Sequence, residues 1–121
     1  MCGIAAVLNS ERTDVKGLPA LMRDLLVVTQ VRGMDSTGMY QMKSDRDLIS
    51  YKKAVDGSTF TQLPKANTMI NHTGYAYATV AHCRKATTGG IKDLIAHPFM
   101  HETNDNVPDF GFVHNGTLDY W

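Results

Sequence analysis

The spacing of apolar positions predicts one strand and one helix in the first third of the chain. Residues 3–8 form a short apolar run, which is typical of a buried strand. Over residues 16–31 the apolar side chains recur at helical spacing. Pro19 suits the first turn of this helix and Gly33 follows its end, where the basic side chain of Arg32 complements the helix dipole.

The middle of the chain changes to the short apolar runs that are typical of strands. Residues 39–42 and 48–51 are separated by the polar residues 44–47, which predicts a β-hairpin. A second short helix follows, with either Asp56 or Ser58 as its N-cap. We expect that helix to end near Leu63, before Pro64.

The last third is predicted to contain two strands joined by a long irregular segment. Residues 75–82 indicate a well-buried strand, and residues 110–114 indicate the last one. Between them, residues 83–106 include Gly89, Gly90 and Pro98, and we expect a loop there. The order strand, helix, hairpin, helix, strand, loop, strand predicts a layered α+β domain.

Composition and charge narrow the functional classes. The chain has 121 residues, 43% hydrophobic and 20% charged, so it can form a core and is not of the disordered class. Twelve basic and twelve acidic side chains cancel, whereas a nucleic-acid-binding protein normally carries a basic excess. The apolar runs are far shorter than the roughly 20 residues that span a bilayer, and no secretory signal pattern opens the chain. With two cysteines, too few for a disulfide scaffold, we expect a cytoplasmic protein that binds neither nucleic acid nor membrane.

Cys2 is the first residue that suggests catalysis. Removal of Met1 would place a thiol and a free α-amine on the same residue. An α-amine has a pKa of about 7.7–8.0, which suits a general base near neutral pH, and a partly ionised thiol is a strong nucleophile. One residue would then supply both nucleophile and base. The alternative is that Cys2 is a small apolar residue that opens a strand.

Two further features lie at predicted strand ends. The side-chain amide of Asn115 and the backbone N–H of Gly116 can together hold a developing oxyanion, although Asn-Gly is also a common turn. The guanidinium of Arg84 can clamp a carboxylate through two hydrogen bonds, although a surface arginine would look the same. Either feature alone leaves both interpretations open.

Residues 32–38 form a polar turn that begins and ends near a glycine. Arg32 and Asp35 could pair within it and fix its shape. We therefore expect this turn to support a site rather than to perform chemistry, through Arg32, Gly33, Asp35 and Ser36.

Five motifs, in order along the chain, carry a family resemblance. They are Cys2-Gly3-Ile4, Arg32-Gly33-x-Asp35-Ser36-x-Gly38, His82-x-Arg84-x-Ala86-Thr87, Ala96-His97-Pro98 and His114-Asn115-Gly116. Together they resemble the class II glutamine amidotransferases, the glutaminase domains with an N-terminal nucleophile. Within that family the chain is most similar to the glucosamine-6-phosphate synthase-like branch. The resemblance extends from residue 1 to about residue 118.

The resemblance implies a mechanism and a set of site residues. Cys2, with Met1 removed, would attack the side-chain amide of glutamine while its α-amine takes the thiol proton. Asn115 and Gly116 would hold the oxyanion, ammonia would leave, and water would hydrolyse the γ-glutamyl thioester. Arg84 would bind the α-carboxylate of glutamine. The residues implied to line the same pocket are Thr87, Thr88 and His97, and no cofactor is implied.

The implied fold is the four-layer α/β/β/α sandwich of the N-terminal-nucleophile hydrolases. We expect residues 1–121 to be its N-terminal portion, with the rest of the sandwich and an acceptor (synthase) domain or partner chain outside it. Lys85 stands where the family usually has an aromatic residue, and Thr88 where a histidine is common. Asp119 lies too close to Gly116 to be the aspartate that binds the α-amine of glutamine.

Three alternatives remain beside this function. One is another N-terminal-nucleophile amidohydrolase, which cleaves a different amide with the same cysteine. Another is an inactive fragment that requires a complementing chain. The third is a metal site built from Cys83 and the histidines, but their spacing fits no metal motif, because Pro98 interrupts the interval between His97 and His101.

Overall fold

The computed structural model describes residues 1–10, 14–44, 47–87, 89–102 and 108–116. Helices and antiparallel strands together make up the described chain, which confirms the predicted α+β class. In order they are β1 (Gly3–Leu8), α1 (Leu18–Thr29), the 3-10 turn η1 (Gln30–Arg32), β2 (Ser36–Ser44), β3 (Asp47–Lys53), α2 (Gly57–Gln62), α3 (Pro64–Asn71), β4 (Ala78–Arg84), the 3-10 turn η2 (Asp93–Ile95), β5 (Phe99–Glu102) and β6 (Pro108–Phe112).

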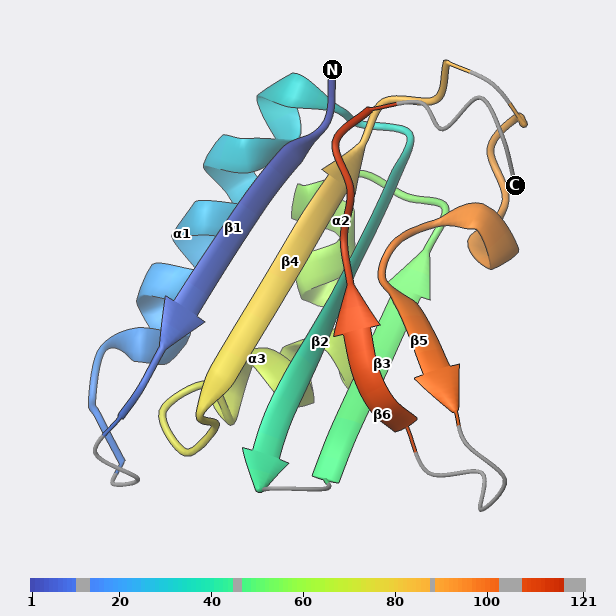
Figure 1. Ribbon diagram of the computed structural model, residues 1–121. Coiled ribbons are helices and arrows are strands. Elements are labelled where there is room, and N and C mark those ends of the chain that lie inside the picture. Colours follow the sequence, from blue (N-terminus) through green and yellow to red (C-terminus); the bar gives the residue numbers. More distant parts are fainter. Residues whose placement is uncertain (11–13, 45–46, 88, 103–107, 117–121) are drawn as a thin grey trace.

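The described elements stack in three layers (Figure 1). The central layer is an antiparallel sheet with the strand order β1-β4-β2-β3. The three helices cover one face, and the two-stranded ribbon β5-β6 lies over β2 and β3 on the other. The α/β/β order of these layers agrees with the implied four-layer sandwich, of which the described residues form three layers.

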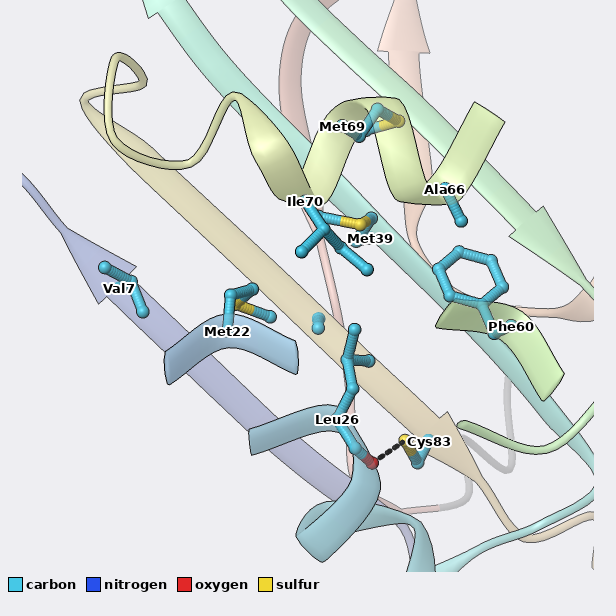
Figure 2. Close-up of a cluster of buried hydrophobic side chains, with 10 residues drawn as sticks. Val7, Met22, Leu26, Met39, Phe60, Ala66, Met69, Ile70 and Cys83 are labelled. Atoms are coloured by element: carbon cyan, nitrogen blue, oxygen red, sulfur yellow. Dashed lines mark hydrogen bonds between the residues drawn. The ribbon is translucent and has the colours of Figure 1, made fainter. Parts of the chain in front are cut away.

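Apolar side chains from all three helices pack against the sheet and form the core (Figure 2). Full burial of one Leu, Ile, Phe or Met side chain stabilises a fold by about 1.5–3 kcal/mol, so these core contacts hold the helices against the sheet. Its fully buried members include Met22, Leu26, Met39, Phe60 and Ile70. The Cys83 thiol also lies here and donates to the carbonyl oxygen of Leu26 at 3.7 Å. Burial raises the pKa of Cys83 to about 11, so this thiol stays protonated and unreactive.

The first helix, the hairpin and the second helix agree with the sequence predictions. Pro19 lies in the first turn of α1, and β2 and β3 form the expected antiparallel pair; the residues 45–46 between them lie outside the described ranges. Asp56, not Ser58, is the N-cap of α2. Its carboxylate accepts a hydrogen bond of 2.9 Å from the backbone N–H of Thr59, which lowers the pKa of Asp56.

α2 ends before Pro64 as predicted, but the sequence pattern did not predict α3: Pro64 occupies its first turn, a position that proline favours because no N–H is needed there. Two sequence predictions about the elements were wrong. The loop predicted over residues 83–106 contains β5. β1 is half-buried rather than fully buried: the helices cover one of its faces and the β5-β6 ribbon does not extend over the other, so its side chains alternate between buried and exposed and Leu8 is 77% exposed. No helix in the described ranges has the length and apolar character needed to cross a membrane.

Candidate active site

Three strand ends and one loop meet along one edge of the central sheet, the edge at which β1 and β2 begin and β4 ends (Figure 1). Gly3 at the start of β1 pairs with Cys83 near the end of β4. Ser36 at the start of β2 pairs with Arg84. The segment that follows β6 runs to the same edge and reaches the N-terminus of the chain. The pairing of the strands and the course of the chain after β6 therefore bring four of the five sequence motifs together.

The backbone of Cys2 contacts Asn115 across 113 residues of sequence. The Cys2 N–H donates to Asn115 Oδ1 at 3.0 Å. Because Oδ1 is occupied in this way, the Nδ2 donors of the same amide are left to act on another group. The two residues that the sequence predicts as nucleophile and oxyanion donor are thus direct neighbours.

The Cys2 thiol lies against the backbone that follows β4. Its Sγ atom is 3.4 Å from the backbone nitrogen of Lys85, which donates to it, and 3.8 Å from the Lys85 carbonyl oxygen. A donor at this distance stabilises a thiolate through a charge-assisted hydrogen bond. Sequence reasoning treated Lys85 only as a departure from the family pattern and missed this contact, because a backbone donor leaves no signature in residue type.

A cavity of about 500 Å³ opens beside Cys2. Its wall is polar near the thiol and apolar along the ribbon. The lining residues are Met1, Cys2, Arg84, Lys85, Thr87, Gly89, Ile95, His97, Phe99, Phe112, His114, Asn115 and Gly116. A cavity of this volume is in the range of small-molecule sites.

The polar turn after α1 supports this site, but not by the internal pair that the sequence suggested. Arg32 Nε donates to the carbonyl oxygen of Cys2 at 3.1 Å. The Asp35 carboxylate instead accepts from the backbone N–H of Ala86 at 2.7 Å and lies 3.6 Å from the Lys85 ammonium. The expected Arg32–Asp35 pair is therefore wrong: each side chain fixes a different segment of the site.

The other two residues of this turn pack against the end of β4. A Cβ atom added to Gly33 would lie 2.4 Å from the backbone of Arg84 and of Lys85, so the close approach requires glycine. Ser36 is buried and opens β2 opposite Arg84. Both residues thus shape the backbone on which the cavity wall depends.

The structure places three of the four predicted substrate-binding residues at the cavity. Arg84, Thr87 and His97 line it, whereas Thr88 lies outside the described residues. One guanidinium nitrogen of Arg84 donates to the carbonyl oxygen of Gly90 at 2.9 Å, which holds the arginine beside the Gly89-Gly90 segment. His97 also accepts a hydrogen bond from the backbone N–H of His114 at Nδ1.

His97, in the cavity wall, stacks on His82. Their rings lie parallel within 15°, with centroids 4.1 Å apart. Burial is the main cause that lowers the pKa of each to about 4, and the coulombic interactions of the two rings with Arg84 and His114, and of His97 with His82, lower it further. Both rings are therefore neutral at pH 7. Among the described residues, no group of three or more histidine, cysteine, aspartate or glutamate side chains is arranged to hold a metal ion.

A cysteine just before the first strand, bonded through its backbone nitrogen to the asparagine of an Asn-Gly pair inside an α+β fold, is the arrangement expected of a class II glutamine amidotransferase domain. Comparison with curated proteins finds chains similar to this one. Glutamine–fructose-6-phosphate aminotransferase (isomerizing) of Idiomarina loihiensis is 29% identical over 119 residues, covering 98% of this chain and 17% of the relative. The enzyme of the same name from Acidithiobacillus ferridurans is 28% identical over 120 residues, with the same coverage. No protein-family model matches the chain.

These similarities confirm the resemblance that the five motifs predicted, since both relatives are glutamine-using aminotransferases by name. The chain spans 17% of the length of each relative.

Proposed function

We propose that this chain is a glutamine-hydrolysing domain in which Cys2, after removal of Met1, is the nucleophile. The observation that carries the proposal is the 3.0 Å hydrogen bond between the Cys2 nitrogen and Asn115 Oδ1. This bond supports the proposal because it joins the nitrogen that would become the α-amine to the amide that would donate to the oxyanion, beside a cavity.

The first half of the reaction uses both reactive groups of Cys2 and two hydrogen-bond donors, one from Asn115 and one from Gly116. The Cys2 α-amine takes the thiol proton, and Sγ attacks the side-chain carbonyl carbon of glutamine. Negative charge moves to the amide oxygen, which Asn115 Nδ2 and the Gly116 N–H stabilise. The ammonium of Cys2 then returns the proton to the leaving nitrogen, ammonia departs, and a γ-glutamyl thioester remains.

The second half regenerates the enzyme. Water attacks the thioester carbon while the α-amine removes its proton, and the same two donors hold the second oxyanion. The thiolate leaves and is reprotonated, so that glutamine and water become glutamate and ammonia. The Lys85 N–H, 3.4 Å from Sγ, stabilises the thiolate at both stages.

Arg84 supplies the binding energy for the substrate's α-carboxylate. Its guanidinium lines the cavity and is the positively charged group best shaped for a bidentate carboxylate contact there. Thr87 and His97 also line the cavity.

The released ammonia serves an acceptor domain or partner chain. The two relatives are by name aminotransferases that use fructose 6-phosphate, and the chain spans 17% of each. We place the protein in the cytoplasm, in line with Cys2 and Cys83 both being free thiols.

Intact mass spectrometry with a glutamine-mimicking electrophile tests the nucleophile directly. The full chain should show loss of Met1 and gain of one label, and Cys2→Ala should gain none. Cys83→Ala is the matched control, since the Cys83 thiol is fully buried, and it should still be labelled. Labelling of Cys2→Ala at the wild-type rate, or retention of Met1 in a chain that hydrolyses glutamine, would contradict the mechanism. A panel of other amides separates glutamine hydrolysis from a different amidohydrolase activity.

A further inference from the structure

Both polar groups of the His114 backbone are held by histidine side chains. The His114 N–H donates to Nδ1 of His97 at 3.0 Å. The His114 carbonyl oxygen lies 3.0 Å from Nε2 of His82. Since β6 ends at Phe112, His114 lies beyond the last strand pairing that the structure describes, and these side chains take the place of a neighbouring strand.

The partners determine which nitrogen of each ring carries a proton. A backbone N–H can only donate, so His97 Nδ1 must be unprotonated to accept from it. A carbonyl oxygen can only accept, so His82 Nε2 must carry a proton. His82 Nδ1 is buried with no hydrogen-bond partner among the described residues, so a proton there would be unpaired and the neutral ring is favoured. The two hydrogen bonds to the His114 backbone, called here the clamp, therefore require His97 to be neutral with its proton on Nε2 and His82 to carry a proton on Nε2.

The environment keeps both rings in that state. They stack at 4.1 Å, so a second positive charge would face the first at close range. Burial lowers the pKa of both histidines to about 4. The charged and titratable groups that face them, Arg84, His114 and, for His97, Lys52, act in the same direction.

We propose that His82 and His97 are positioning residues for glutamine hydrolysis, which clamp the backbone of His114 and thereby place Asn115 and Gly116 against Cys2. This rests on the proposed function. His97 acts here through its bond to the backbone, and not by binding substrate. The next residue along, Asn115, makes the 3.0 Å contact with Cys2, so a shift of His114 moves the oxyanion donors directly. A misplacement of about 1 Å can cost roughly 10²-fold in rate.

Isosteric variants test the clamp nitrogen by nitrogen. The Oδ1 atom of asparagine occupies the place of a histidine Nδ1, and the Nε2 atom of glutamine that of a histidine Nε2. His97→Asn and His82→Gln should therefore keep the clamp, whereas His97→Leu and His82→Leu should break it. His72→Leu is the control, because the His72 side chain is exposed at the C-terminal end of α3 and its Nδ1 lies against the carbonyl oxygen of Thr68 in the same helix, away from the clamp.

Two readouts separate positioning from substrate binding. In the chain freed of Met1, His97→Leu should lower kcat for glutamine by about 10²-fold, with KM within about threefold. His97→Asn should recover at least about tenfold of that loss. By NMR, the His114 amide should exchange with solvent faster in His97→Leu than in the wild type, and both rings should show the Nε2–H tautomer in the wild type.

The outcomes distinguish this proposal from the one on which it rests. An unchanged exchange rate of the His114 amide in His97→Leu, or a His97 variant that raises KM while kcat is kept, would overturn the clamp. A wild-type chain that hydrolyses no glutamine would contradict the proposed function. In that case, faster His114 exchange in His97→Leu, and its reversal in His97→Asn, would still support the clamp's geometry.

Discussion

The carboxylate of Asp35 accepts a hydrogen bond of 2.7 Å from the backbone N–H of Ala86. This bond joins the turn after α1 to the segment that follows β4. The Asp35 N–H donates to the carbonyl oxygen of Arg84 at 3.0 Å, so the two segments are tied at both backbone and side chain. Lys85, between the two partners, presents its N–H to the Cys2 thiol. Asp35 thus supports the nucleophile without touching it.

Replacement of Asp35 should lower stability and slow the reaction of Cys2 together. Asp35→Ala leaves the Ala86 N–H unpaired in a partly buried position, a change that costs about 1–3 kcal/mol. The free energy of unfolding in urea measures this loss. The rate of Cys2 alkylation by a glutamine-mimicking electrophile should fall as well. Asp35→Asn keeps an acceptor oxygen and loses only the ion pair with Lys85, which is worth about 0–1 kcal/mol. Equal effects from both variants would show that the bond to Ala86 is not what Asp35 contributes.

Gly33→Ala should be more damaging than its size suggests. The added Cβ atom would lie 2.4 Å from backbone atoms of Arg84 and Lys85, and backbone cannot move away as a flexible side chain can. Overpacking of this kind typically costs about 1–3 kcal/mol, and here it also displaces the donor to Cys2. Gly17→Asn is the matched control. Gly17 has a φ of 94° and open space around it, and asparagine tolerates that conformation. Thermal unfolding of the two variants should differ clearly, and similar melting temperatures would contradict the close approach.

The sequence predicted elements whose signal is local and missed those that depend on pairing. The periodicity over residues 16–31 located α1, and the N-cap rule and Pro64 located the start and the end of α2. β5 has only four residues, too few for an alternating pattern, and it exists because it pairs with β6. Pro64 was taken as a stop for α2, although the same residue suits the first turn of α3.

The same distinction applies to the candidate site. The motifs pointed to Cys2, Arg84 and Asn115 through residue type and order alone. The supporting contacts could not be predicted, because their partners are backbone groups: the N–H of Ala86 for Asp35 and both polar groups of His114 for the stacked histidines. Any residue type can supply such a group. Only the three-dimensional arrangement of the segments shows which residue supplies the backbone group.

Arg84→Ala should weaken glutamine binding and leave the chemical step largely intact. Loss of a charge-assisted hydrogen bond of about 1.5–3 kcal/mol corresponds to a KM that is roughly 10- to 150-fold higher. The comparison substrate is 4-aminobutanamide, which lacks the α-carboxylate. For that substrate Arg84→Ala should change KM little, because the partner of the guanidinium is already missing. Lys92→Ala, an exposed cation outside the cavity lining, is the control. If Arg84→Ala raises KM equally for both amides, Arg84 does not bind the carboxylate.

The stacked histidines should make the stability of the protein depend on pH between about 4 and 6.5. The pKa of His82 and that of His97 are each lowered to about 4 in the fold, against an ordinary value of about 6.5. Within this window the unfolded chain binds more protons than the folded one. The contribution of the two histidines to the free energy of unfolding is therefore fully present above about pH 6.5. It decreases as the pH falls, by at most about 1.4 kcal/mol per pH unit for each histidine.

Urea unfolding of the full chain at several pH values measures this slope. Asp56 and Asp93 have a pKa lowered from 3.8 by their hydrogen bonds, so their contribution is lost only below this window. The double variant with His82→Gln and His97→Asn keeps the clamp's donor and acceptor but cannot titrate, so its stability should be flatter between pH 4 and 6.5. His72→Leu, which removes an exposed histidine, should retain the wild-type slope. If the stability of the double variant depends on pH as strongly as that of the wild type, the two rings are protonated in the folded state at these pH values. That outcome would contradict the clamp, because the bond from the His114 N–H to His97 Nδ1 does not permit a protonated His97.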